Sequence, residues 1–163
     1  MMSFPVQRDV VCDPSQDGYS HLNVWSRAQT KLGRALSNMA NIGVSIPKDG
    51  FFITLEGYWW YLATGRLYPQ FANLNGFEAR RYGKTLKKVH MDDFEERIKN
   101  ALTIKIRSNR WILDELTKPE NALPLCHYYV YGKHPECVVR LANNSLWQLD
   151  HIESIRSNGG VKS

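Results

Sequence analysis

The stretch TLEGYWWYLATG, residues 54–65, decides the fold of the central part of the chain. Thr54 is a favoured helix N-cap, because its hydroxyl can accept a hydrogen bond from an N–H group of the first turn. Gly65 supplies a C-terminal stop, and Pro69 prevents the helix from resuming. We therefore predict a helix from residue 55 to about residue 64, the most aromatic helix of the chain.

Outward from this helix, the chain alternates between further helices and a few strands. Apolar periodicity and stop residues predict helices at residues 77–82 (closed by Gly83), 92–108, 111–116 and 149–156. β-Branched and aromatic runs predict strands at residues 9–12, 125–131 and 137–141. Residues 23–38 show no clean period and are predicted to form a strand plus loop. The sequence thus predicts an α+β fold, mainly helical, with a small antiparallel sheet.

The bulk properties fit one globular domain. The chain has 163 residues, of which 43% are apolar and 23% charged, and these are ordinary proportions. We expect a single domain over residues 1–163, with its core at about residues 23–156 and a mobile tail at residues 157–163. The formal net charge of +5 favours a polyanionic partner such as nucleic acid, with solubility alone as the alternative.

Cysteine usage and hydropathy indicate where the protein resides. No apolar run approaches the roughly 20 residues that a bilayer span needs, and the first residues lack the order of a secretion signal. Cys12, Cys126 and Cys137 form no close-spaced pair, which fits a reducing compartment. We expect a cytoplasmic protein with no membrane partner.

Glu56 is the first candidate site residue. On a helix, Trp59 and Trp60 share its face, so a carboxylate is placed against indole rings. Its position in the first helical turn favours the ionised form. An ionised carboxylate beside aromatic walls suits a nucleobase or ribose, which stacks on the rings while its polar groups bond the acid. The alternative is a helix-capping glutamate beside core tryptophans.

Lys105 is the second candidate. At about 100 degrees per residue it falls on one stripe with Phe94, Ile98, Ala101 and Leu102. An ammonium on this apolar stripe has a lowered pKa, and a neutral lysine can form a Schiff base with a sugar aldehyde. Snorkelling is the alternative: the stem covers apolar surface while the charged head reaches water.

A third group, Cys126, His127, His134 and Cys137, contains zinc-type ligands. Because adjacent strand residues point to opposite faces, Cys126 and His127 can hardly bind one ion. We therefore predict no metal. The chain also lacks the glycine-rich phosphate loop, the dinucleotide fingerprint and the serine-hydrolase elbow.

In order along the chain, these motifs resemble those of the NADAR family, also called YbiA-like. The matching segments are LSNM (residues 36–39), Asp49–Gly50, EGYWWYLA (56–63), ARRYGK (79–84), ALTIKI (101–106), ANNSLW (142–147) and the final ESIR (153–156). The resemblance covers about residues 32–156. Gly57, Ile106 and the Gln148–Leu149 pair depart from the family pattern, which implies a different rim and substrate preference.

The resemblance implies a NADAR-like fold with a pocket for an ADP-ribose-type ligand. Family members remove ADP-ribose from guanine in nucleic acid, or cleave an N-glycosidic bond in riboflavin-pathway intermediates. Carried over to this sequence, the resemblance implies functional roles for Glu56, Lys105 and Asn38, and makes Trp147 a wall of the site.

Together these expectations give a leading hypothesis, an N-glycosidase that removes ADP-ribose from guanine in DNA, as in DNA repair by a phage-type anti-toxin. Lys105 attacks the anomeric carbon or traps the opened sugar, and Glu56 transfers protons and positions the ribose hydroxyls. Neither a cofactor nor a metal is required. The expected substrate contacts come from Asn38, Trp59, Trp60, Arg80, Arg81, Lys84 and Trp147. Cleavage of a free metabolite and binding of ADP-ribose without turnover are the alternatives, and Lys84 is the rival amine. Strand preference and oligomeric state stay open.

Overall fold

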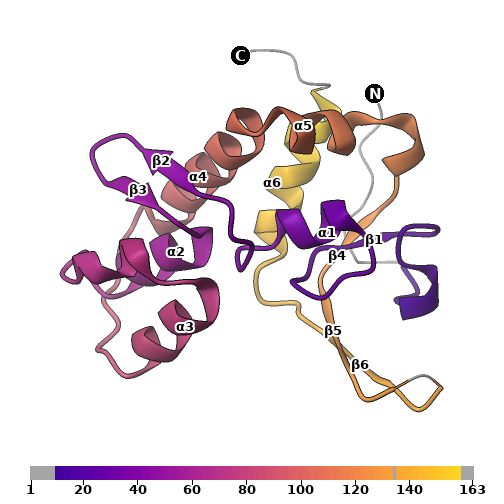
Figure 1. Ribbon diagram of the computed structural model, residues 1–163, viewed down its shortest axis with the longest axis horizontal. Helices are drawn as coiled ribbons and strands as arrows, with labels where there is room; N and C mark the ends of the chain where they lie inside the picture. Colours follow the sequence, from indigo (N-terminus) through magenta and orange to yellow (C-terminus); the bar gives the residue numbers. More distant parts are fainter. Residues whose placement is uncertain (1–9, 134, 159–163) are drawn as a thin grey trace. The chain divides into compact units, whose positions relative to one another are not determined.

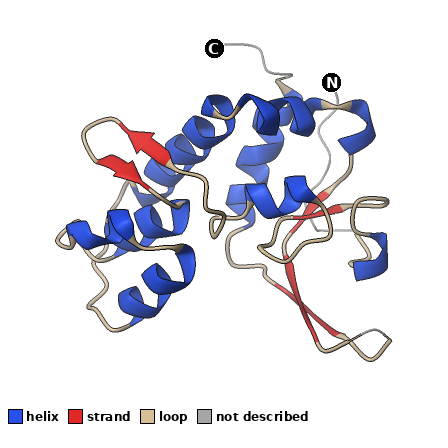
Figure 2. Cartoon of the chain, viewed as in Figure 1, coloured by secondary structure: helices blue, strands red, loops and turns tan. Residues whose placement is uncertain are grey.

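The computed structural model describes residues 10–133 and 135–158, whose path is drawn in Figure 1. These residues form six α-helices and three separate two-stranded sheets, as Figure 2 shows by colour. The α+β class and the mainly helical content are thereby confirmed. The chain divides into two compact units: unit 1 takes the described parts of Met1–Ser37 and Asn109–Ser163, and unit 2 is Asn38–Ser108. A single domain over residues 1–163 stays a prediction.

Unit 2 combines one hairpin with three helices. The hairpin pairs β2 (Val44–Ile46) with β3 (Gly50–Phe52) in antiparallel register. The α-helices are α2 (Leu55–Ala63), α3 (Gly76–Lys84) and α4 (Phe94–Ser108), and a 3-10 helix, η2 (Pro69–Asn73), precedes α3. Helix α2 packs against α3 and α4, and α4 also packs against β2. The buried core of this unit includes Val44, Phe52, Leu55, Leu62, Phe71, Ile98 and Leu102.

Helix α2 confirms the prediction made from the central stretch of sequence. The Thr54 hydroxyl accepts a hydrogen bond from the Gly57 N–H at 3.0 Å, so Thr54 caps the helix as expected. After the C-cap residue Thr64, Gly65 adopts a φ of +84°, a left-handed conformation that glycine takes at little cost. Sequence signals at both ends therefore set the length of this helix.

Helix α3 is longer than predicted, and Gly83 does not close it. The helix starts from Asn75, whose side chain forms a capping box with Glu78, and it continues to Lys84. A Cβ on Gly83 would lie 2.4 Å from Cε3 of Trp60. Gly83 therefore serves close packing between α3 and α2 inside the helix, and reading it as a stop signal was wrong.

Unit 1 contains the other three helices and two of the strand pairs. Its helices are α1 (Lys31–Leu36), α5 (Arg110–Thr117) and α6 (Leu146–Ser157), with two 3-10 turns, η1 (Pro14–Gln16) and η3 (Pro119–Asn121). Helix α5 packs against α1 and α6. The predicted helices at residues 92–108 and 111–116 are confirmed within two residues, as α4 and α5.

The strands of unit 1 confirm the segments predicted at residues 125–131, with a break at His127, and at residues 137–141, but they do not form a single antiparallel sheet. β5 (Tyr128–Tyr131) and β6 (Val138–Leu141) pair antiparallel, whereas β4 (Leu125–Cys126) pairs parallel with β1 (Leu22–Asn23). The Asn23 amide explains this pairing, because its Oδ1 accepts from the Tyr128 N–H and its Nδ2 donates to the Tyr128 carbonyl, both at 3.0 Å. A side chain thus extends the ladder where the backbone pairing ends.

Two predictions for the N-terminal part are wrong. Residues 10–12 form no strand, and Asp9 lies outside the described residues. Within residues 23–38, the predicted loop contains α1, which begins after Thr30, whose hydroxyl accepts from the Gly33 N–H at 2.9 Å. With six residues, α1 is too short to produce a periodic apolar pattern in the sequence.

Helix α6 begins three residues before the predicted start and ends with a buried ion pair. Arg156 donates from Nε to Glu153 Oε2 at 2.7 Å and also donates to the Asn121 and Leu123 carbonyls. Arg156 of the final ESIR segment therefore fixes the backbone of η3 and of the residues after it. Ser157 belongs to the helix and Asn158 caps it, while residues 159–163 of the expected tail lie outside the described residues. Among the described helices, none combines the length and apolarity needed to span a bilayer.

Candidate functional site

Glu56 sits in the first turn of α2, where the backbone fixes its position. Its N–H donates a hydrogen bond to the Asn38 carbonyl at 2.9 Å. The bond joins the loop that follows α1 in sequence to the start of α2. Two residues predicted for the site, Asn38 and Glu56, are thereby brought together through their main chains, and the Glu56 side chain leaves from a fixed point.

The Glu56 carboxylate is held by Trp60 one turn later on α2. The indole N–H of Trp60 donates to Glu56 Oε1 at 3.0 Å, and both residues are half-buried. Burial raises the pKa of Glu56, while the Trp60 hydrogen bond and the charge of Arg80 act in the opposite direction with smaller effect. The expected aromatic neighbour is present, but burial opposes the ionised form that the helix-terminus position predicts.

Trp60 is itself fixed on more than one side. The backbone of Gly83 packs against the fused ring, and Lys88 Nζ lies 5.5 Å from the ring centroid in a cation–π contact. Because the Trp60 indole N–H donates to Glu56, Trp60 is arranged to orient the Glu56 carboxylate. A role for Trp60 as a stacking wall stays a prediction.

Trp59 points to a different neighbour. Its ring centroid lies 4.8 Å from that of Phe94 at an interplanar angle of 89°, an edge-to-face contact that joins α2 to the start of α4. The helical spacing that placed Trp59 near Glu56 therefore also brings it onto α4. Its expected contact with a ligand stays a prediction.

The three cations predicted to contact the substrate in unit 2 all lie on α3. Arg80, Arg81 and Lys84 are all exposed, and within residues 10–133 and 135–158 none has an ion-pair partner. Arg80 is close enough to Glu56 for its charge to lower the pKa of that acid. The structure thus brings Arg80 near Glu56, which itself contacts Trp60 and the Asn38 backbone.

Lys105 is fully buried in α4, with 0% of its surface exposed. Burial lowers the pKa of its amine to about 7. The apolar stripe is confirmed for Ile98, Ala101 and Leu102, which are also buried. A snorkelling lysine would place its head in water, so this burial overturns the snorkelling alternative.

Trp147 belongs to unit 1, in the first turn of α6, and is half-buried there. Its predicted role as a wall of the site beside Glu56 rests on the family resemblance and stays a prediction.

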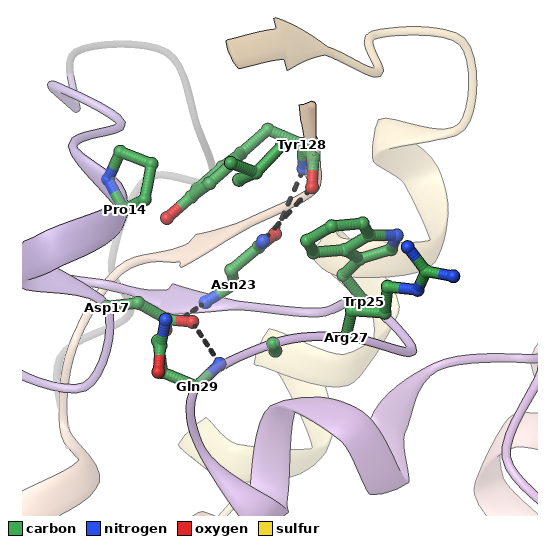
Figure 3. A pocket seen from close by; sticks show the side chains of 9 residues that line it. Pro14, Asp17, Asn23, Trp25, Arg27, Gln29 and Tyr128 are labelled. Atoms are coloured by element: carbon green, nitrogen blue, oxygen red, sulfur yellow. Dashed lines mark hydrogen bonds between the residues drawn. The ribbon is translucent and has the colours of Figure 1, made fainter. Parts of the chain in front are cut away.

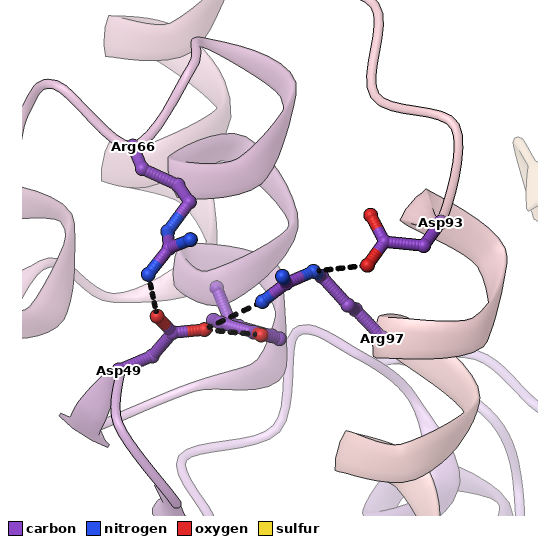
Figure 4. Close-up of polar contacts among 5 residues, drawn as sticks. Asp49, Arg66, Asp93 and Arg97 are labelled. Carbon is purple, nitrogen blue, oxygen red and sulfur yellow. Dashed lines mark hydrogen bonds and ion pairs between the residues drawn. The ribbon is translucent and has the colours of Figure 1, made fainter.

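A buried carboxylate in unit 2 carries a network that the motif search did not identify (Figure 4). The Asp49 side chain is only 1% exposed; Arg66 approaches it at 2.6 Å and Arg97 at 3.6 Å, and Tyr58 donates to it at 2.7 Å. Burial and Asp49 raise the pKa of Tyr58. The network ties the β2–β3 turn to α2 and α4. The sequence marked Asp49 only as part of a family motif, because its partners are remote in sequence.

Unit 1 contains a cavity of about 190 Å³ that sequence reasoning also missed (Figure 3). Asp17 in its wall accepts hydrogen bonds from the Asn23 and Gln29 N–H groups, both at 2.9 Å. Trp25, Arg27 and Tyr128 also line it. None of the predicted site residues lines this cavity or the neighbouring depression, which shares Pro14, Asp17 and Gln29. The only advance signal was the aromatic and polar run at residues 21–29.

In the part of the chain that the structure describes, no group of three His, Cys, Asp or Glu side chains is arranged to hold a metal ion. Of the weighed zinc ligands, His134 lies outside the described residues. Comparison with models of known protein families gives no match, and comparisons with curated protein sequences and with solved structures give none either. The NADAR-like assignment therefore stays a prediction from the motifs.

Proposed function

We propose that this chain is an N-glycosidase that removes ADP-ribose from ADP-ribosylated guanine in DNA, with Glu56 and Lys105 as its catalytic residues. The observation that carries the proposal is the fully buried amine of Lys105, on a helix that packs against the helix of Glu56. Buried ionisable groups with shifted pKa values gather at functional sites more often than elsewhere. The family resemblance assigns the same two residues.

Lys105 is suited to act as a nucleophile near neutral pH. Because burial lowers the pKa of its amine to about 7, the neutral form that carries the lone pair becomes accessible near neutral pH. Lys84, the rival amine, is exposed at the end of α3 and lacks this desolvation. The proposal therefore assigns the attack on the sugar to Lys105.

Glu56 is suited to give and accept a proton. Burial raises its pKa, which favours the protonated carboxylic acid that can donate to a leaving group. The Trp60 N–H holds the carboxylate in one orientation, and Arg80 limits how far the pKa rises. These properties suit a carboxyl group that donates a proton in one step and accepts a proton in the next.

The proposed reaction proceeds in two steps. In the first, the Lys105 lone pair forms a bond to the anomeric carbon, the bond from that carbon to the guanine nitrogen breaks, and Glu56 protonates the departing base. In the second, a proton moves from the lysine nitrogen to the ring oxygen, and the sugar opens to a Schiff base on Lys105. Water then adds to the same carbon, the lysine nitrogen leaves as the neutral amine, and the Glu56 carboxylate takes up the remaining proton. One water is consumed, and the products are unmodified DNA and free ADP-ribose.

A basic segment favours DNA over a free metabolite. Residues 80–88 contain Arg80, Arg81, Lys84, Lys87 and Lys88, all exposed, and no acidic residue. Such clusters attract phosphate backbones, whereas a small metabolite needs only one or two cations. The net charge of +5 acts in the same direction.

Incubation with two substrates tests this proposal. One is a labelled DNA oligonucleotide ADP-ribosylated on a single guanine, and the other is a free riboflavin-pathway N-glycoside. We expect release of the unmodified strand and of ADP-ribose from the first. Turnover of the free glycoside alone would show that the substrate is a small metabolite and not DNA. Retention of the modified strand without cleavage would show that the protein is a binding module.

A further inference from the structure

The ribbon formed by β5 and β6 presents one side to solvent. Tyr129 pairs with Arg140 and Tyr131 with Val138, and residues directly opposite in an antiparallel pair share a side of the ribbon. Tyr131 is 53% exposed and Val138 62%, whereas Tyr128, on the other side, is buried. Figure 1 shows the ribbon extending away from α5 and α6 of its own unit. Tyr131 and Val138 on this side are therefore open to solvent in the part of unit 1 that the structure describes.

Three aromatic rings form a row that continues this exposed side. The Trp25 and Tyr129 centroids are 6.2 Å apart at 83°, and those of Tyr129 and Tyr131 are 6.4 Å apart at 39°. We call Trp25, Tyr129 and Tyr131 the aromatic row. The Tyr129 ring also meets the His127 ring, at 5.2 Å and 65°, so Tyr131 at the exposed end of the row is the ring most open to a flat group.

Cations flank the aromatic row. Arg140 lies opposite Tyr129, Arg27 follows Trp25 by two residues, and Lys133 lies in the turn of the ribbon. All three are exposed, and none has an ion-pair partner within the described ranges 10–133 and 135–158. Residues 128–141 contain a single acid, Glu136. The charge beside the row is therefore positive.

We infer that the aromatic row and its flanking arginines bind single-stranded nucleic acid. Successive bases stack on aromatic side chains while cations follow the phosphates, which is how proteins bind single strands without reading sequence. Trp25 and Arg27 also line the unit 1 cavity, so the row ends at a recess with about 190 Å³ of space. A duplex would keep its base faces stacked and hidden, and so cannot use the row.

This inference deepens the proposed function, because it names the form of DNA that the glycosidase would engage. Its test is separate, since binding of an unmodified strand requires no ADP-ribose and no catalysis. A protein that binds the strand without releasing ADP-ribose would overturn the proposed function alone. Release that persists without strand binding would overturn the inference alone.

Fluorescence anisotropy with a labelled twelve-nucleotide thymidine strand at low salt measures the binding. Removing one stacking ring costs about 1–3 kcal/mol, so Tyr131→Ala should weaken binding by roughly tenfold. Tyr131→Phe keeps the ring and should bind like the wild type. Tyr19→Ala, which removes an exposed tyrosine outside the row, is the matched control. Arg140→Gln should reduce the slope of log Kd against log salt by about 0.7.

Three results would overturn the inference. The first is equal affinity of the wild type and Tyr131→Ala for the strand, with thermal unfolding showing both to be folded. The second is tighter binding to a duplex of equal length than to the single strand. If sedimentation instead shows a dimer that Val138→Lys dissociates, the ribbon is an interface between two copies, and the inference is wrong.

Discussion

The indole N–H of Trp60 donates to the Glu56 carboxylate at 3.0 Å, one helical turn along α2, so an aromatic side chain orients the proposed catalytic acid. This bond stabilises the ionised form and opposes the effect of burial on the pKa of Glu56. The bond can be removed while most of the ring is kept, which makes its effect measurable.

Replacing Trp60 by Phe should raise the pKa of Glu56 further, because the carboxylate loses a donor while its burial persists. The carboxyl carbon resonance of Glu56, followed against pH by NMR, should show a midpoint above that of the wild type. Trp59→Phe is the control, since the Trp59 ring packs against Phe94. An unchanged midpoint in Trp60→Phe would show that the hydrogen bond does not set the acidity of Glu56.

Lys105→Met should stabilise the protein at pH values below 7 and lose that advantage as the pH rises. The amine has a pKa of about 7 when folded and near its ordinary 10.5 when unfolded, so the unfolded state binds more protons between these values. The cost of burying Lys105 therefore lowers the free energy of unfolding by its full amount below pH 7, and it disappears above about pH 10.5. With a difference of roughly 3.5 pKa units, it amounts to roughly 5 kcal/mol at most.

Urea unfolding of wild type and Lys105→Met at pH 6, 8 and 9.5 measures this effect. The difference in the free energy of unfolding between the two proteins should shrink steadily across the series. A difference that stays constant with pH would mean that Lys105 is not desolvated in the folded state.

Asp49→Asn should destabilise the protein, because Arg66 and Arg97 lose the charge of the buried carboxylate that they share. Breaking a buried ion pair costs about 3–5 kcal/mol. Because both arginines are about one-third exposed, we expect Asp49→Asn to lower the free energy of unfolding by about 2 kcal/mol. Asp114→Asn removes the exposed pair with Arg110 and should cost less than about 0.5 kcal/mol. Equal losses in the two variants, measured by urea unfolding, would contradict a central role for Asp49.

Gly83→Ala should destabilise α3 against α2, although alanine favours helices by about 1 kcal/mol. The new methyl group would lie 2.4 Å from Cε3 of Trp60, and such overpacking typically costs about 1–3 kcal/mol. Adding Trp60→Ala removes the contacted ring, so in that background Gly83→Ala should be neutral or stabilising. This double-mutant cycle fails to support the packing role if the cost of Gly83→Ala is the same in both backgrounds.

The local signals in the sequence predicted α2, α4 and α5 well, because their ends are set by caps, glycine and proline within a few residues. Gly83 was misread because a packing glycine and a stop glycine look identical in one sequence. Helix α1 was missed since six residues carry too little periodicity, and the parallel β1–β4 pair depends on Asn23 meeting Tyr128, 105 residues away.

The candidate site was predicted in part. Helical spacing alone placed Trp60 on Glu56 and Lys105 on an apolar stripe, because both relations lie within one helix. The direction of the Glu56 pKa shift was not predictable, since burial depends on tertiary packing. The Asp49 network and the aromatic row were also invisible to motif reasoning, because each joins residues from separate elements.

Reductive trapping tests the central claim most directly. The protein is mixed with guanine-ADP-ribosylated DNA and sodium borohydride and is then digested with a protease. Mass spectrometry of the peptides locates the adduct. If Lys105 attacks the sugar, the reduced ADP-ribosyl adduct should lie on Lys105. It should form more slowly in Glu56→Gln, because the departing base then lacks its proton donor, and it should be absent from Lys105→Met but present in Lys84→Met. An adduct on Lys84, or ADP-ribose release by Lys105→Met at the wild-type rate, would contradict the account.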